Sequence, residues 1–141
     1  MGIMEKEQAI EKTVDFILKY STYKTKEKVK DFVEKHYEYK TCYIILDDIN
    51  EVIAFCRWNV SQNMNYFEVL DCIIREDHRN RNLMADMIEN GLKIWPVKFI
   101  RFKKGYDDGT KQQRWHIWNI QQLLRRLKKN VQHIQQSTST V

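Results

Sequence analysis

The stretch DCIIREDHRNRNLMADMIENGLKIW, from Asp71 to Trp95, changes character halfway along and decides the fold. Up to Ile74 it is apolar and typical of the end of a buried strand. From Leu83 its apolar residues recur at the spacing of one helical face. Only polar residues lie between, from Arg75 to Asn82. This junction is either a cradle for an anionic ligand at the start of a helix, or a solvated turn between two packed elements.

The residues before this stretch predict two helices and then three strands. Helical spacing runs over 3–20 and 24–37, and Ser21 and Thr25 are candidate N-caps. The runs 42–46, 51–60 and 66–74 are rich in β-branched and aromatic residues, and polar turn sequences at 47–50 and 61–65 separate them. We therefore expect consecutive antiparallel strands leading into the junction.

The residues after it predict a second hairpin and a last helix. Pro96 ends the helix that starts near Leu83, because the residue before a proline is pushed out of the helical region. A strand is expected over 97–102, a turn over 105–109 and a returning strand over 113–118. A helix beginning near Gln112 is the alternative. From Asn119 the pattern is that of an amphipathic helix, and 130–141 is a polar tail that we expect to be frayed.

The order of elements defines the expected fold class. A strand–helix–strand unit over 66–102 implies two parallel neighbouring strands joined by a right-handed crossover. We expect one α+β (α/β) domain over 1–129, with a mixed, mostly antiparallel sheet around this central parallel unit. The length of 141 residues suits a single domain.

Composition excludes several classes of protein. No apolar run approaches the roughly 18 residues of a membrane span, and the N-terminus has no signal-peptide core. Cys42, Cys56 and Cys72 form no C-x-x-C pair, and the four histidines lack metal-ligand spacing, so no metal site is predicted. Free cysteines in apolar runs fit a reducing compartment, and we expect a cytoplasmic protein.

The junction resembles the pyrophosphate loop of the GNAT acyltransferase superfamily. The family signature is Arg or Gln, two residues, Gly, one residue, then Gly or Ala, directly before a long helix. The corresponding residues here are Arg79, Asn80, Arg81, Asn82, Leu83 and Met84. Arg79 agrees, whereas Asn82 and Met84 replace small residues. Asparagine tolerates positive φ and so can keep the turn. Met84 would either crowd a phosphate or point into the core beside Met87 and Ile88.

The resemblance covers roughly 42–106 and implies a function. It implies transfer of an acetyl group from acetyl-CoA, as co-substrate, to an amine of a small molecule or protein. Residues 79–84 would hold the pyrophosphate, and the main chain of Cys72, Ile73 and Ile74 would pair with the pantetheine arm. Glu68 stands eleven residues before Arg79, where some members have a general base. Tyr106 is the candidate to protonate the departing thiolate.

Glu68 also has a structural interpretation, since a strand glutamate is often paired with a cation such as Arg57. Strict alternation places Glu68 on one face with Leu70, Cys72 and Ile74. It places Asp71, the alternative carboxylate, on the other face with Phe67, Val69 and Ile73.

The basic C-terminal third supports a second hypothesis. Residues 97–129 carry ten Lys or Arg and two Asp, whereas 1–96 carry fourteen basic and seventeen acidic residues. Trp115 and Trp118 could stack on bases, or lie in the core beneath the last helix. The alternative is thus an inactive GNAT-like module, such as an accessory protein of a phage or mobile element. It would bind nucleic acid or a protein partner through Arg114, Arg125, Arg126, Lys128 and Lys129, with the tryptophan-bearing hairpin as a candidate homo-oligomer interface.

Overall fold

The fold is described from a computed structural model, which covers residues 5–104 and 114–128, with the main chain alone for 79–81, 104 and 114. Three predicted features lie outside the described residues: the 105–109 turn, Tyr106 within it, and the tail over 130–141.

Two helices open the chain, close to where they were predicted. They are α1 (Lys6–Tyr20) and α2 (Lys26–Tyr39). Thr25 occupies the N-cap position of α2 but makes no capping bond through its side chain. The prediction for Ser21 was wrong, because it ends α1: its Oγ donates a hydrogen bond to the carbonyl oxygen of Ile17 over 2.6 Å.

One sheet holds every described strand, in the order β1-β2-β3-β4-β5. The strands are β1 (Cys42–Leu46), β2 (Val52–Val60), β3 (Tyr66–Ile74), β4 (Phe99–Lys104) and β5 (Arg114–Asn119). All neighbours are antiparallel except β3 and β4, which are parallel. The predicted fold class is therefore confirmed.

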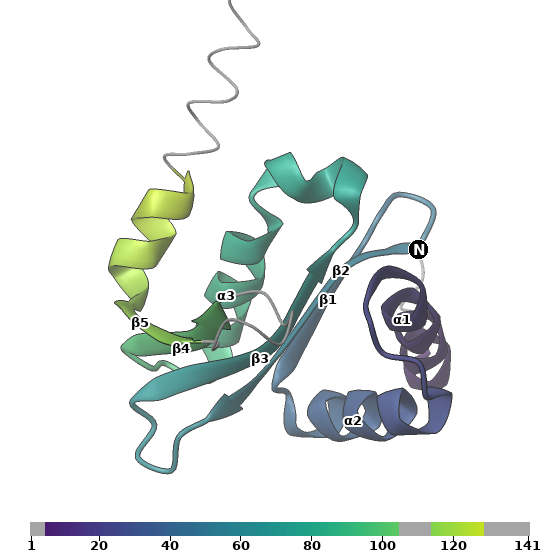
Figure 1. Ribbon diagram of the computed structural model, residues 1–141, viewed down its shortest axis with the longest axis horizontal. Helices are drawn as coiled ribbons and strands as arrows, with labels where there is room; N and C mark the ends of the chain where they lie inside the picture. Colours follow the sequence, from purple (N-terminus) through teal and green to yellow (C-terminus); the bar gives the residue numbers. More distant parts are fainter. Residues whose placement is uncertain (1–4, 105–113, 129–141) are drawn as a thin grey trace, which may run out of the picture.

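The parallel pair exists because a helix carries the chain back across the sheet. A 3-10 helix, η1 (Glu76–Arg81), leads from β3 into α3 (Leu83–Ile94). Residues 114–119 are a strand and 120–128 are helical, so the alternative of a continuous helix from Gln112 was wrong. Figure 1 shows α1 and α2 on one face of the sheet, with α3 and the helix over 120–128 on the other.

Each face of the sheet has its own hydrophobic core. Under α1 and α2, the side chains of Val14, Ile17, Val29 and Val33 pack around Phe55, which is fully buried. On the α3 face the core is larger, and its buried residues include Cys56, Trp58, Phe67, Met87, Ile88, Ile100 and Leu124. Within the described ranges no helix has the length and apolar character needed to cross a membrane.

Gly91 allows α3 to lie very close to the sheet. A Cβ atom at this position would be 2.9 Å from Cζ2 of Trp58 and 3.5 Å from Cε2 of Phe67. Real Cβ atoms are essentially never as close as 2.9 Å to another heavy atom, so only glycine fits here without a shift of the Trp58 ring. This close approach fixes the height of α3 above β2 and β3.

Candidate functional site

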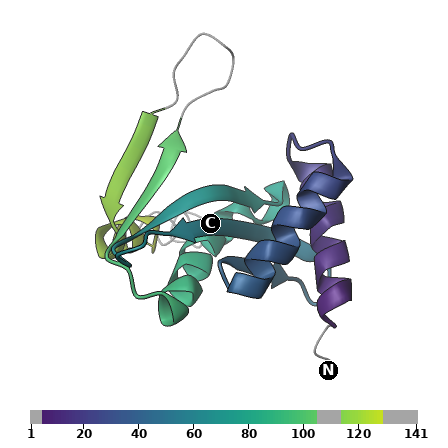
Figure 2. The same cartoon turned by 90° about the horizontal axis from the view of Figure 1, so that it is seen from below.

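The parallel strands β3 and β4 pair only where they begin. Their register joins Tyr66 to Phe99, Phe67 to Ile100 and Glu68 to Arg101, and goes no further. Yet β3 continues to Ile74 and β4 to Lys104. In Figure 2 the hairpin of β4 and β5 rises away from the rest of the sheet. The two strands therefore open into a wedge, which we call the β3–β4 opening.

Asn82 makes the turn into α3 with a left-handed main chain, at φ 61° and ψ 31°. Asparagine is the residue that best tolerates this conformation after glycine. The structure therefore agrees with the expectation that Asn82 can keep the turn. The first helical hydrogen bond runs from the amide of Asp86 to the carbonyl of Asn82. No side chain in the described residues caps the helix, so its first amides point out of the N-terminus.

Met84 packs against the hydrophobic core on the α3 face and is only partly buried. Of the two placements considered for this side chain, the structure has the one directed toward the core. The residue that departs most from the family signature therefore does not project fully over the helix N-terminus.

The junction itself folds as the 3-10 helix η1, which includes the main chain of Arg79, Asn80 and Arg81. At its start the carboxylate of Asp77 accepts hydrogen bonds from Arg75 Nε at 2.8 Å and His78 Nδ1 at 2.9 Å. The Arg75 bond, followed by the His78 bond, holds the pKa of Asp77 well below its usual range. The negative charge of Asp77, at the start of η1, is thus largely compensated by these two donors.

Cys72 lies on β3 at the predicted pantetheine edge, together with Ile73 and Ile74. It is exposed and stands directly opposite Cys56 in the β2–β3 register. A hydrogen bond from Cys56 lowers the pKa of Cys72, and the same bond raises that of Cys56. Cys42 is half-buried, and burial raises its pKa to about 12. Cys72 therefore differs from the two other thiols, which are shielded.

A β-bulge at Leu70 corrects the predicted faces of β3. The register passes from Trp58–Val69 to Arg57–Asp71 and skips Leu70. As a result Phe67 packs in the α3 core while Ile73 packs in the α1–α2 core, although strict alternation would put them together. The bulge also brings Glu68 and Asp71 to the same face, opposite α3. The prediction that they lie on opposite faces was wrong, because an extra residue reverses the alternation.

Glu68 is paired with a cation, and that cation is Arg101 of β4. Arg101 Nη2 donates to Glu68 Oε2 over 2.5 Å, and Arg101 Nε donates to the same oxygen over 3.2 Å. The pair spans the strands at the last paired register before the β3–β4 opening. Arg57, the partner suggested from sequence, is used elsewhere.

Arg101 and Lys103 alternate with aromatic rings on this face of the hairpin. The guanidinium of Arg101 lies 4.8 Å from the Tyr66 ring and 4.5 Å from the Trp115 ring, and Lys103 Nζ lies 4.9 Å from Trp115. Trp115 is 42% exposed, whereas Trp118 packs against the α3 core. The interpretation of both tryptophans as core residues holds for Trp118 and not for Trp115.

Asp71 belongs to a half-buried polar network that sequence reasoning did not predict. It accepts from Arg57 Nε over 2.5 Å and from the Tyr23 hydroxyl over 3.0 Å. Arg57 Nη1 lies 3.3 Å from His36 Nε2, and His36 Nδ1 lies 2.7 Å from Thr41 Oγ1. Burial, then the charge of Arg57, lowers the pKa of His36. A neutral ring that accepts from Arg57 and donates to Thr41 satisfies every group.

One signal for this network was present in the sequence. Arg57 and Asp71 are opposite charges in the middle of two neighbouring apolar strands. The exact pairing depended on the bulge at Leu70, and the position of Tyr23 depended on how the α1–α2 turn meets the sheet. Neither can be read from local pattern.

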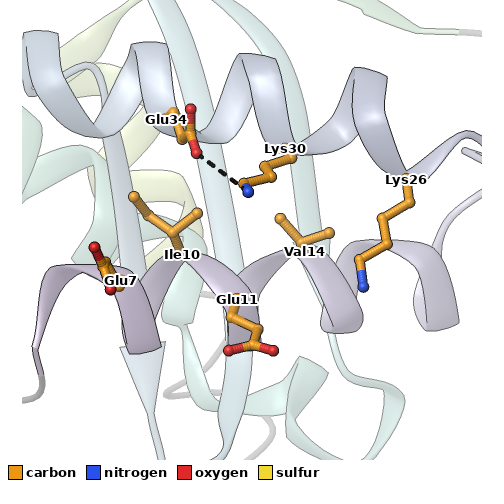
Figure 3. Close-up of a pocket in the computed structure, with 7 residues that line it drawn as sticks. All are labelled: Glu7, Ile10, Glu11, Val14, Lys26, Lys30 and Glu34. Carbon is orange, nitrogen blue, oxygen red and sulfur yellow. Dashed lines mark ion pairs between the residues drawn. The ribbon is translucent and has the colours of Figure 1, made fainter.

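A groove on the two N-terminal helices is separate from the β3–β4 opening. It has a volume of about 440 Å³ and lies between α1 and α2, lined by Glu7, Ile10, Glu11, Val14, Lys26, Lys30 and Glu34 (Figure 3). Lys30 and Glu34 form an ion pair of 3.9 Å within it. Acidic and basic side chains are mixed, and the loose pair is exposed, so the groove offers no selective chemistry.

Known proteins match this chain in structure and not in sequence. No model of a protein family matches the sequence, and no curated protein does. An aminoglycoside 6'-acetyltransferase type Ii matches with a TM-score of 0.64 at 9% identity, covering 82% of this chain and 92% of its own. A GNAT family N-acetyltransferase from Escherichia coli, in complex with CoA, matches with a TM-score of 0.53 at 8% identity, covering 79% of this chain and 76% of its own.

A third match shows that the fold also occurs inside longer chains. A candidate acetyltransferase from Pyrococcus horikoshii matches with a TM-score of 0.56 at 15% identity, over 73% of this chain but only 37% of its own length. The three matches define the class of structure: the chain has the fold of the GNAT N-acetyltransferases. The resemblance inferred from the junction and the element order is confirmed at the level of the fold.

Proposed function

We propose that the protein is an acyl-CoA-dependent N-acetyltransferase. The observation that carries the proposal is the β3–β4 opening, which ends beside an uncapped helix N-terminus. A helix N-terminus presents unpaired amides and the positive end of the helix dipole, and both favour a pyrophosphate. In support, a solved structure with this fold contains CoA.

Two features at the start of α3 support the proposal of a CoA site there. The left-handed Asn82 exposes the start of α3, and Met84 is directed toward the core. Arg79 and Arg81 add positive charge along the sequence of the junction, and Asn80 and Leu83 complete it. Alternate residues of a strand direct their main-chain groups to either side. We propose that main-chain groups of Cys72 and Ile73, which lie beyond the last β3–β4 pair, bond to the pantetheine arm.

Acetyl-CoA, when bound, supplies an activated acetyl thioester. The chain's own residues would then position the amine and move its proton. The amine nitrogen would bond to the carbonyl carbon of the thioester and lose a proton, the C–S bond would break, and the sulfur would leave as a thiol after gaining a proton. We propose Glu68 as the base that takes the amine proton, directly or through water, and Tyr106 as the donor to the thiolate. We propose that main-chain N–H groups beside the bulge at Leu70 polarise the carbonyl.

The ion pair with Arg101 affects how Glu68 could act as the proposed base. Because Glu68 accepts two hydrogen bonds from Arg101, its carboxylate is oriented toward β4 at the base of the opening. Both bonds from Arg101 go to Oε2, so we propose that the other oxygen, Oε1, meets the incoming amine.

Ligand-induced stabilisation tests the proposal without knowledge of the acceptor. Acetyl-CoA at about 100 times its dissociation constant stabilises a binder by about 2.7 kcal/mol, which raises Tm by about 8 °C in a domain of this size. Acetate with free adenosine is the control. An unchanged Tm at millimolar acetyl-CoA would refute the proposal.

A second candidate function is the binding of nucleic acid or a protein by an inactive module. The exposed Trp115 beside Arg101 and Lys103 favours it, as do the exposed Arg125 and Arg126. Lys128 supports it less, because it forms an ion pair with Glu89. Nucleic-acid affinity would fall steeply with added salt and would weaken in Arg125→Ala and Arg126→Ala. An affinity that changes neither with salt nor in these two variants would exclude the basic surface as the nucleic-acid binding site.

A further inference from the structure

The face of the sheet opposite α3 is only partly covered. On this face α1 and α2 pack over β1 and β2, and the β4–β5 hairpin extends beyond them (Figures 1 and 2). Apolar side chains are exposed there: Phe99 at 40%, Trp115 at 42% and Ile117 at 69%. Glu68 lies at the inner end of this uncovered area, beside the β3–β4 opening. We call it the hairpin face.

The charges on the hairpin face are unbalanced. Glu68 is already joined to Arg101 by an ion pair of 2.5 Å, and its neighbour Asp71 is joined to Arg57 by another of 2.5 Å. Lys103 has no carboxylate partner among the described residues, and its ammonium group lies over the Trp115 ring. A ligand on this face therefore meets the compensated carboxylate of Glu68, exposed apolar surface, and a Lys103 that has no carboxylate partner within 5–104 and 114–128.

We infer that the acyl acceptor is a primary amine carried on a molecule with a carboxylate or other anionic group and an apolar part. The inference rests on the proposed function for the reaction, but its binding step can be measured alone. The anionic group would pair with Lys103, the apolar part would lie on Trp115 and Ile117, and the amine would reach Glu68. Polycationic amines would be disfavoured by like charge. The acceptor class thus differs from the aminoglycosides named for a protein of the same fold.

Two products that differ only in a carboxylate test the inference directly. N-acetyltyrosine carries the anionic group, and N-acetyltyramine lacks it. Each is titrated into the full-length protein in low salt, and the dissociation constant is read from the indole N–H signal of Trp115. We expect N-acetyltyrosine to bind about three- to tenfold tighter, the range for a partly exposed charge pair.

Charge reversal at Lys103 identifies the source of that preference. In Lys103→Glu the preference for N-acetyltyrosine should disappear or invert. Lys28→Glu is the matched control, because Lys28 is exposed on α2 and away from this face. It should keep the wild-type ratio. Neither residue is part of the proposed catalytic machinery, and neither is buried.

The outcomes separate the acceptor class from the enzymatic function. Equal affinities for the two products, no binding of either, or an unchanged ratio in Lys103→Glu would overturn the inference. Displacement of N-acetyltyrosine by stoichiometric single-stranded oligonucleotide would also overturn it, in favour of a nucleic-acid surface. If acetyl-CoA raised Tm in a parallel sample, the proposed function would stand despite that failure. A retained preference without any effect of acetyl-CoA would leave an anion-selective surface and refute the enzyme.

Discussion

At the scale of single residues, the two carboxylates of β3, Glu68 and Asp71, differ in their partners and in their exposure to solvent. Asp71 is joined to Arg57 and Tyr23 in a network where the Arg57 and Asp71 side chains are only 15% and 16% exposed. Glu68 and Arg101 form a more exposed pair, at 24% and 32%. The first arrangement suits a structural role, and the second leaves the carboxylate accessible.

Substitution by the matching amide should separate these roles. Glu68→Gln should lower the rate of acetyl transfer by about 10²- to 10⁴-fold with acetyl-CoA binding retained, because it removes the proposed base. Asp71→Asn should instead lower the free energy of unfolding by about 2–3 kcal/mol, since it leaves Arg57 without its counter-ion. Urea denaturation and CoA-thiol release measure the two effects. Wild-type turnover in Glu68→Gln would eliminate it as the base.

Met84 gives a second prediction at the same scale. Because Met84 packs against the core, Met84→Gly should not tighten CoA binding, and it should destabilise the protein by about 2 kcal/mol through lost packing and a glycine in a helix. Met84→Leu is the control that keeps the volume, and it should cost less than about 1.5 kcal/mol. Isothermal titration and thermal denaturation supply both numbers. Tighter binding in Met84→Gly would mean that the side chain crowds the phosphates.

Sequence reasoning foresaw the left-handed turn at Asn82 and a cation beside Glu68, but it did not identify that cation as Arg101. The tolerance of asparagine for positive φ is a local property, so its consequence could be foreseen. The partner of Glu68 depended on the parallel register of β3 with β4, which local pattern does not encode. Tyr106 lies outside the described residues and stays a prediction.

At the scale of elements, α3 depends on its close contact with β2. Gly91→Ala should lower the free energy of unfolding by about 1 kcal/mol, because the clash with Trp58 outweighs the gain in helix propensity. In a Trp58→Phe background the smaller ring removes the clash, and the same substitution should become neutral or stabilising. A thermal double-mutant cycle checks this. Additive effects in the cycle would show that Gly91 and Trp58 are not in contact.

Element boundaries followed from the sequence wherever the period was clear. The spans of β1 and β3 match the prediction residue for residue, and α3 begins at Leu83 as expected. The bulge at Leu70 and the 3-10 helix over Glu76–Arg81 were not predicted. Both are set by how β3 meets its neighbours, and both lie where the candidate site is built.

At the scale of the whole molecule, one network ties the α1–α2 layer to the sheet and makes stability depend on pH. The pKa of His36 is lowered by burial and by Arg57. The unfolded chain therefore binds a proton at His36 near pH 6.5 where the folded chain does not, so stability is complete above about pH 6.5 and falls below it. Urea midpoints at pH 7.5 and 5.5 should show this loss. His36→Gln should flatten the dependence in that window, and an unchanged slope would assign it to other groups.

The fold was predictable as a whole because its defining feature is the helical connection between two parallel strands. A strand, a polar junction and an amphipathic helix imply a parallel crossover, and the rest of the sheet follows from hairpins. The chemistry is carried by departures from regular pairing, namely the β3–β4 opening and the bulge. Those departures depend on contacts between distant residues, such as Glu68 with Arg101.

The most direct test of the account is an amide chemical-shift titration of the labelled protein with CoA. The amides of Cys72 and Ile73 and of residues 82–85 should shift together and saturate with one dissociation constant, while those of α1 and α2 stay unchanged. The absence of shifts at millimolar CoA would contradict the claim that the β3–β4 opening and the N-terminus of α3 form one anion-binding site. Shifts confined to the basic residues of β4, β5 and 120–128 would contradict it equally.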